Sequence, residues 1–195
     1  WNLTGGARHV TDATNASRTL LFDIHRQDWS PEMLDLIGVP AACLPQVLDC
    51  ADDFGWLDPD ILGAPIPIRG VAGDQQSALM GQGCLKAGEM KATFGTGGFM
   101  LLNTGEAAPA SGSRLLTTVA SRLNGKTTYA LEGSIFIAGA AIDWLSNELG
   151  VPGGPKGAEA LAMSARSDHG VMVVPAFTGL GAPWGIRPRA ERSWA

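Results

Sequence analysis

The chain has 195 residues, which is enough for one domain or for parts of two. Hydrophobic residues make up 45% of it and charged residues 17%, a balance typical of an α/β protein with a buried core. The formal net charge of -5 argues against nucleic acid or an anionic membrane as a partner. No apolar run reaches the roughly 20 residues that span a bilayer, so we expect no membrane span.

Cysteines and histidines give no sign of a metal site. The three cysteines lack metal-ligand or redox spacing: Cys43, Cys50 and Cys84. Their odd number favours reduced thiols in the cytoplasm. The three histidines have no partners at metal or triad spacing: His9, His25 and His169. The chain starts at Trp1 without a signal peptide and continues with sequence typical of a domain interior, so we expect a fragment of a longer protein.

The first part of the chain predicts short elements. Residues 18–24 form an apolar run that fits a helix or a strand equally well. Ser30 followed by Pro31 predicts the start of a short helix. Residues 44–50 suggest another helical turn, residues 51–65 a solvated loop, and residues 66–72 a strand.

The second part of the chain predicts a sheet and three helices. Asn124-Gly125 is the strongest hairpin signal in the chain. The predicted strands cover residues 89–94, 99–103, 115–123, 126–131 and 171–175. The predicted helices cover residues 75–85, 134–149 and 157–164. Residues 89–149 therefore predict an antiparallel meander followed by a helix.

The segment 70–99 contains two polar turns that suggest chemistry. The first follows a predicted strand and carries Asp74 and Gln75. The second, Gly-Thr-Gly-Gly at residues 95–98, has a bare backbone that can approach a phosphate group. An acid beside a phosphate-binding turn is the minimal equipment of a phosphoryl-transfer enzyme.

Each of these features also has a purely structural interpretation. Asp74 could cap a helix, residues 95–98 could be an ordinary hairpin turn, and Phe99 could belong to the core. Gln75 could be a solvated residue of a first helical turn. Glu132 could serve only to cap the helix predicted at residues 134–149.

Six motifs together resemble the glycerol kinases, members of the carbohydrate kinase family that includes the xylulose kinases. They are TNASRT (14–19), GVAGDQQSAL (70–79), TFGTGGFML (93–101), LNTGE (102–106), YALEGSIFIAGAAIDWL (129–145) and VVPAFTGLGAP (173–183). The resemblance implies an α/β, ribonuclease H-like (actin-like ATPase) fold. Residues 1–86 would be the C-terminal part of the first, substrate-side domain. Residues 87–183 would be the N-terminal part of the second, nucleotide-side domain.

The resemblance also implies roles on the substrate side. Asp74 matches the catalytic base, which would accept the proton of the attacking hydroxyl group. Gln75 matches a contact to a glycerol hydroxyl, and Phe99 matches the aromatic residue that covers the carbon atoms of glycerol.

On the nucleotide side, Gly95 and Thr96 match the turn that contacts the phosphates of ATP. Gly139 matches a nucleotide contact where a helix comes close. Asp143 departs from the family pattern, which has glutamine there, and a carboxylate pointing inward would repel phosphate. Mg²⁺ follows from the chemistry, since the phosphate groups need a counter-charge. The side chains themselves predict no metal ligand set.

The expected function is the phosphorylation of glycerol by ATP, with this chain an incomplete and inactive fragment of the enzyme. The alternatives are a kinase of another sugar or polyol, and a non-catalytic remnant that acts only in binding. The resemblance is compatible with a homo-oligomer for the full-length enzyme. Residues 184–195 do not match the family, and a back-translation shifted by two bases restores a family-like sequence, so we expect a frameshifted tail.

Overall fold

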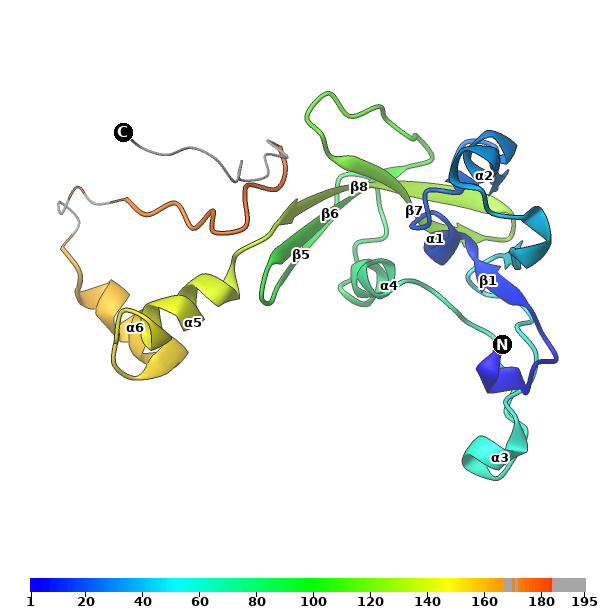
Figure 1. The fold of residues 1–195 in the computed structure, drawn as a ribbon, viewed down its shortest axis with the longest axis horizontal. Helices are drawn as coiled ribbons and strands as arrows, with labels where there is room; N and C mark the ends of the chain where they lie inside the picture. Colours follow the sequence, from blue (N-terminus) through cyan, green and yellow to red (C-terminus); the bar gives the residue numbers. More distant parts are fainter. Residues whose placement is uncertain (167–169, 171, 184–195) are drawn as a thin grey trace. The chain divides into compact units, whose positions relative to one another are not determined.

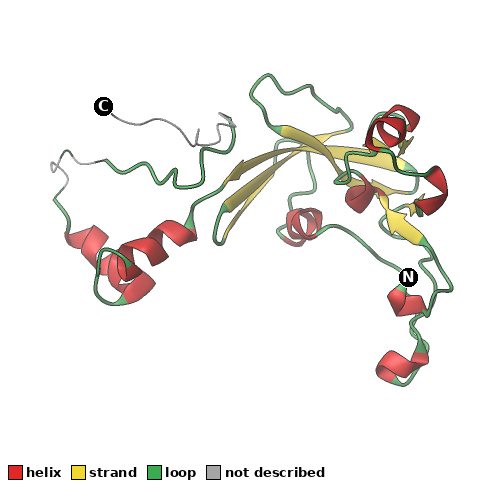
Figure 2. Ribbon diagram, viewed as in Figure 1, coloured by secondary structure: helices red, strands yellow, loops and turns green. Residues whose placement is uncertain are grey.

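The computed structural model describes residues 1–166, 170 and 172–183 (Figures 1 and 2). Up to residue 81 its elements are η1 (Asn2–Thr4), β1 (Val10–Asp12), α1 (Ala13–Ala16), β2 (Phe22–Asp23), β3 (Asp28–Trp29), α2 (Pro31–Ile37), η2 (Ala41–Cys43), β4 (Gln46–Leu48), α3 (Pro59–Leu62) and α4 (Asp74–Gly81). They are followed by β5 (Met90–Phe94), β6 (Gly98–Gly105), β7 (Leu116–Leu123), β8 (Lys126–Ile135), α5 (Gly139–Asn147) and α6 (Gly154–Ser164). None of the helices in these ranges combines the length and hydropathy that crossing a bilayer requires.

The chain divides into two compact units that are discontinuous in sequence. The first consists of Trp1–Lys91, Leu101–Ser111 and Leu116–Glu132. The second consists of Ala92–Met100, Gly112–Leu115 and the described part of Gly133–Ala195. Strands β5, β6 and β8 each cross from one unit to the other, so the boundary between the units does not fall at a single point in the sequence.

The main sheet has four strands in the order β5-β6-β8-β7. Strands β7 and β8 form the predicted antiparallel hairpin, with Leu123 opposite Lys126. Asn124 and Gly125 have φ angles of 52° and 73°, and positive φ at both central residues is what a type I′ hairpin turn requires. The order of strands corrects the predicted meander, because β8 rather than β7 lies beside β6. The long connection between β6 and β7 allows this, while the tight turn holds β7 to β8.

Several shorter predictions are confirmed, and others are wrong. Helix α2 begins as predicted, with the Ser30 hydroxyl accepting a hydrogen bond from the Met33 N–H at 3.3 Å. Residues 44–50 contain strand β4, not a helical turn, and β4 pairs in parallel with β1. The predicted strand at 66–72 is only an isolated bridge between Pro67 and Trp56.

Differences elsewhere concern where elements begin and end. The predicted loop at residues 51–65 contains helix α3. Helix α5 begins at Gly139, later than predicted, because strand β8 continues to Ile135. Residues 172–175 form no strand, and residue 171 lies outside the described residues, as do residues 184–195 with the predicted frameshifted tail.

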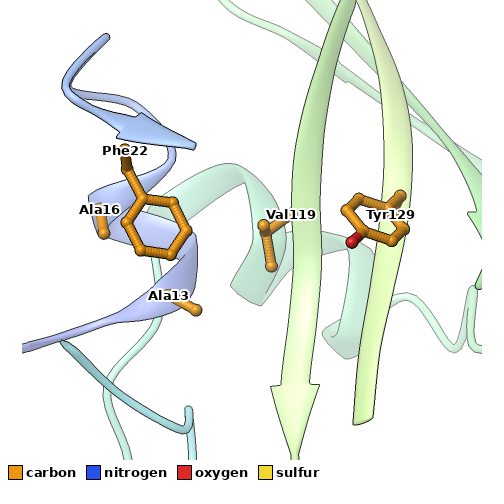
Figure 3. Packing of buried hydrophobic residues seen from close by; sticks show 5 residues of the cluster. All are labelled: Ala13, Ala16, Phe22, Val119 and Tyr129. Carbon is orange, nitrogen blue, oxygen red and sulfur yellow. The ribbon is translucent and has the colours of Figure 1, made fainter. Parts of the chain in front are cut away.

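The first unit is packed on both faces of the β7–β8 hairpin. One buried cluster joins α1, β2 and the hairpin and consists of Ala13, Ala16, Phe22, Val119 and Tyr129 (Figure 3). A second cluster joins α4 to the sheet and consists of Leu79, Cys84, Leu101, Ala120 and Ala130. Tyr129 and Ala130 are successive strand residues and therefore point to opposite faces. The hairpin thus holds in place α1 and α4, which are joined by the contact between Thr14 and Gly73.

Candidate active site

Asp74 is the first residue of helix α4, and buried groups fix the backbone just before it. The hydroxyl of Thr14 accepts a hydrogen bond from the N–H of Gly73 at 2.9 Å. That hydroxyl also donates to the Asp12 carboxylate, which accepts the N–H of Thr14 at 2.8 Å as well. Asp12 and Thr14 are fully buried, whereas Asp74 is exposed. A rigid support therefore presents an accessible carboxylate.

A second chain of contacts runs from Asp74 into the interior. The Gln75 side-chain Nε2 donates to Asp74 Oδ2 at 3.1 Å. The Gln75 Oε1 atom accepts a hydrogen bond from Nζ of Lys91, which comes from strand β5. Lys91 is only 1% exposed, so a charged side chain lies beneath the candidate base.

The surroundings of Lys91 include an ion pair in which only the carboxylate is buried. Glu132 on strand β8 is 3% exposed, and its Oε1 lies 2.8 Å from Nη2 of Arg18. Burial lowers the pKa of Lys91 from its ordinary value, while the negative charges of Glu132 and Asp74 act against this shift. Glu132 therefore does not cap the helix predicted at residues 134–149; it is a buried strand residue that balances cationic groups.

Arg18, Lys91 and Glu132 were not predicted as parts of the site. Arg18 closes the TNASRT motif, and Lys91 stands two residues before TFGTGGF. Charged residues in such motifs are normally exposed, and only the tertiary fold buries Lys91 and Glu132 and pairs Arg18 with Glu132. The position of Lys91 inside the predicted strand at residues 89–94 was the available signal.

In the second unit, the turn at residues 95–98 is hydrogen-bonded to the start of α5. The N–H groups of Ala138 and Gly139 donate to the carbonyl oxygens of Thr96 and Gly95, each at 2.8 Å. A Cβ atom at Gly139 would lie 2.5 Å from the Gly95 oxygen, so only glycine allows this approach. A Cβ atom at Gly97 would similarly lie 2.6 Å from the oxygen of Ile135.

A pocket of about 540 Å³ opens beside this turn. Its described lining is formed by Phe94, Gly95, Gly139, Ile142, Asp143, Ala158, Glu159 and Ala162. Three of the predicted nucleotide-side residues, Gly95, Gly139 and Asp143, therefore meet at one pocket. The carboxylates of Asp143 and Glu159 make it acidic, which suits the hydroxyl and amino groups of a nucleoside better than phosphate.

The remaining predicted residues divide between the two units. Asp74 and Gln75 belong to the first unit, whereas Thr96 and Phe99 belong to the second. Phe99 lies in strand β6 and is 38% exposed, so its ring is partly available for contact. Thr96 is exposed at the turn.

The described residues contain no group of three or more histidine, cysteine or acidic side chains that could hold a metal ion. The ring of His9 packs edge-on against Trp1, with 6.0 Å between the ring centroids. His169 lies outside the described residues. The three cysteines are free thiols.

Comparison with protein families gives two matches in chain order. Residues 1–81 match the N-terminal domain of the FGGY family of carbohydrate kinases, and residues 90–194 match the C-terminal domain of that family. The chain is 60% identical over 184 residues to the glycerol kinase of Alteromonas mediterranea. It is 58% identical over 184 residues to glycerol kinase 1 of Pseudomonas aeruginosa. Each alignment covers 94% of this chain and 37% of the relative, so the chain spans little more than a third of these enzymes.

Solved structures agree with the sequence matches. The glycerol kinase of Plasmodium falciparum, crystallised with ADP, has a TM-score of 0.84 and 42% identity, covering 94% of this chain and 37% of that one. A xylulose kinase from Lactobacillus acidophilus has a TM-score of 0.79 at 21% identity over 91% of this chain and 36% of that one, and so shares the fold. The fold is thus the predicted actin-like, ribonuclease H-like α/β fold. The chain belongs to the FGGY family of carbohydrate kinases, with segments that match both of the family's domains.

Proposed function

We propose that the protein carrying this chain transfers the γ-phosphoryl group of ATP to glycerol, giving glycerol 3-phosphate and ADP. The observation that carries the proposal is the exposed carboxylate of Asp74, supported from below by the buried Asp12–Thr14–Gly73 contacts. The 60% identity to the Alteromonas mediterranea glycerol kinase favours glycerol as the acceptor among sugars and polyols.

On the substrate side, Asp74 is the general base. As the glycerol oxygen attacks the γ-phosphorus atom, its proton passes to the carboxylate, and the bond to the ADP oxygen breaks. Gln75 would hydrogen-bond a glycerol hydroxyl group, and the partly exposed ring of Phe99 would cover the carbon atoms. The protein's contribution is positioning more than covalent chemistry.

On the nucleotide side, Gly95 and Thr96 would contact the phosphates, with Gly139 and Asp143 at the pocket beside the turn. Asp143 and Glu159 would accept hydrogen bonds from the sugar or base of the nucleotide. Mg²⁺ would neutralise the phosphate charges. The small number of acidic groups here fits an ion that takes most of its ligands from phosphates and water.

The test is a grafted kinase, in which residues 1–183 of this chain replace the matching segment of the Alteromonas mediterranea enzyme. We expect ATP-dependent phosphorylation of glycerol, faster than that of dihydroxyacetone or pentuloses, in an assay that couples ADP release to absorbance. Asp74→Asn should abolish turnover, because an amide does not take up the proton. A grafted kinase that prefers a pentulose would support a different sugar kinase.

The 195-residue chain by itself is expected to release no ADP from ATP, Mg²⁺ and glycerol, because it spans only 37% of its relatives. Turnover by the chain alone that disappears in Asp74→Asn would contradict this. ATP binding without turnover would fit the alternative of a non-catalytic binding piece. We further propose a cytoplasmic location, which the free thiols of the described chain support. We also propose that the junction between the two family domains lies near residue 87, although the compact units interleave there; the gap between the matches to residues 1–81 and 90–194 supports this.

A further inference from the structure

Lys91 occupies an unusual place for a lysine. Its side chain is 1% exposed in strand β5, and a buried ammonium group is costly unless polar groups surround it. Here Nζ donates to Gln75 Oε1, and the carboxylates of Glu132 and Asp74 are close enough to influence its charge. Glu132 is in turn paired with Arg18 at 2.8 Å. The cation is thus hydrogen-bonded to α4 and lies within the electrostatic influence of a carboxylate on β8.

The two partners of Gln75 impose the same orientation on its amide group. An ammonium group has only donors, so the amide must turn its oxygen towards Lys91. An ionised carboxylate has only acceptors, so the amide must turn its nitrogen towards Asp74. The contacts agree with both demands, with Oε1 at Lys91 and Nε2 at Asp74. The chemistry of both neighbours therefore demands the same orientation of the amide group.

We propose that Lys91 is a positioning residue that fixes the amide of Gln75, so that Gln75 acts as a hydrogen-bond donor to the acceptor substrate. This inference rests on the proposed role of Gln75 at the glycerol site. The amide nitrogen has two N–H groups, and the contact to Asp74 uses one of them. The second is assigned to a substrate hydroxyl. That hydroxyl accepts from Gln75 and donates to Asp74, which aims its proton at the base.

The consequence is a requirement on the substrate. A hydroxyl group meets both demands, because it is a donor and an acceptor at once. A carbonyl oxygen at this position has no proton to donate to Asp74. An ammonium group has no lone pair to accept the N–H of Gln75. Lys91 thus contributes to selection for an alcohol without contacting the substrate itself.

The test is a double-mutant cycle in the grafted kinase. Lys91→Met should raise the KM for glycerol about tenfold, the effect of losing one hydrogen bond between Gln75 and glycerol, and leave the KM for ATP within about twofold. Gln75→Ala should have a similar effect. The double variant should resemble Gln75→Ala, because Lys91 acts through Gln75. Lys126→Met, an exposed lysine of the same sheet, is the matched control and should change neither constant.

Two outcomes would overturn the inference. One is a double variant whose effect is the product of the single effects, since Lys91 would then act independently of Gln75. The other is an equal rise in both KM values, which would indicate a general structural role. If Lys91→Met does not fold, Lys91→Gln takes its place, because it keeps a donor without a buried charge. Its KM for glycerol should stay near that of the unmodified enzyme, and a tenfold rise would count against the proposal.

A readout that needs no turnover separates this inference from the proposed function. Labelling of glutamine with ¹⁵N gives the side-chain amide signal of Gln75, assigned by its loss in Gln75→Ala. Lys91→Met should shift this signal, and Lys126→Met should not. An unmoved signal refutes the link between Lys91 and Gln75, whichever acceptor the enzyme uses. A shifted signal in an enzyme that ignores glycerol would refute only the choice of glycerol.

Discussion

The hydroxyl of Thr14 receives a hydrogen bond from the backbone N–H of Gly73, at 2.9 Å and across 59 positions of sequence. This contact ties the β1–α1 segment to the residue that precedes the candidate base. Because the group is buried and also bonded to Asp12, it has little freedom to move.

Thr14→Val removes the hydroxyl while keeping the shape of the side chain. It leaves the Gly73 N–H and the Asp12 carboxylate each short of a buried partner, so the free energy of unfolding should fall by about 1–3 kcal/mol. Displacement of Asp74 should lower kcat of the grafted kinase about tenfold. Urea denaturation and the coupled assay measure the two effects. Thr14→Ser keeps the hydroxyl and should preserve most of the stability and most of kcat. If Thr14→Ser lost as much stability and activity as Thr14→Val, the explanation would be wrong.

Gly139→Ala tests the close approach between α5 and the turn. The added Cβ would lie 2.5 Å from the Gly95 oxygen, so the helix start must move and the KM for ATP should rise about tenfold. The KM for glycerol should change much less. Gly112→Ala is the matched control, since Gly112 has open space around it. Unchanged ATP kinetics in Gly139→Ala would show that the turn tolerates the movement.

The thiols should differ in how their reactivity depends on pH. Burial raises the pKa of Cys50 from 9.0 to about 11, and the nearby carboxylates of Asp12 and Asp49 add to the shift. The reactive thiolate of Cys50 is therefore scarce below pH 11. Iodoacetamide at pH 8–9 should label the exposed Cys43 well before Cys50, as mass spectrometry of peptides will show. Faster labelling of Cys50 would mean that this region opens readily. Cys43→Ser provides the background rate.

Arg122 should contribute more to stability than an exposed arginine. Its Nε lies 2.7 Å from Asp49 Oδ1, and its Nη2 donates to the Val47 carbonyl at 3.0 Å. Arg122→Met leaves the largely buried Asp49 carboxylate without its cation, so the free energy of unfolding should fall by about 3 kcal/mol. Arg26 pairs with Glu32 at 3.9 Å on the surface, and Arg26→Met should cost less than about 1 kcal/mol. If urea denaturation showed the same loss of unfolding free energy in Arg122→Met and Arg26→Met, this ranking would be wrong.

Local signals predicted the elements that depend on local chemistry. The Asn124-Gly125 pair predicted the β7–β8 hairpin, and Ser30 with Pro31 predicted the start of α2. The predictions from sequence were wrong where a strand pairs with residues far away in the chain. Strand β4 has three residues and exists because it pairs with β1, far back in the chain, so its local pattern carried no information. The order of strands in the main sheet failed for the same reason.

The residues of the candidate site likewise include some that the sequence predicted and some that only the structure revealed. The motifs located Asp74, Gln75 and the turn at residues 95–98, since these lie next to glycines whose spacing is visible in the sequence. The burial of Lys91 and Glu132 could not be foreseen, because it depends on elements that meet only in the folded chain. Charge in a sequence is visible, but its desolvation is a property of the tertiary structure.

The hydrogen bonds between α5 and the turn have a consequence for electrostatics. The beginning of a helix normally offers free N–H groups and a partial positive charge to an anion. At the start of α5 the N–H groups of Ala138, Gly139 and Ala140 are already bonded to the carbonyl oxygens of Thr96, Gly95 and Thr96, at 2.8, 2.8 and 3.2 Å. These N–H groups are therefore used within the protein, and a phosphate beside α5 would depend on the turn at residues 95–98 and on its own counter-ion.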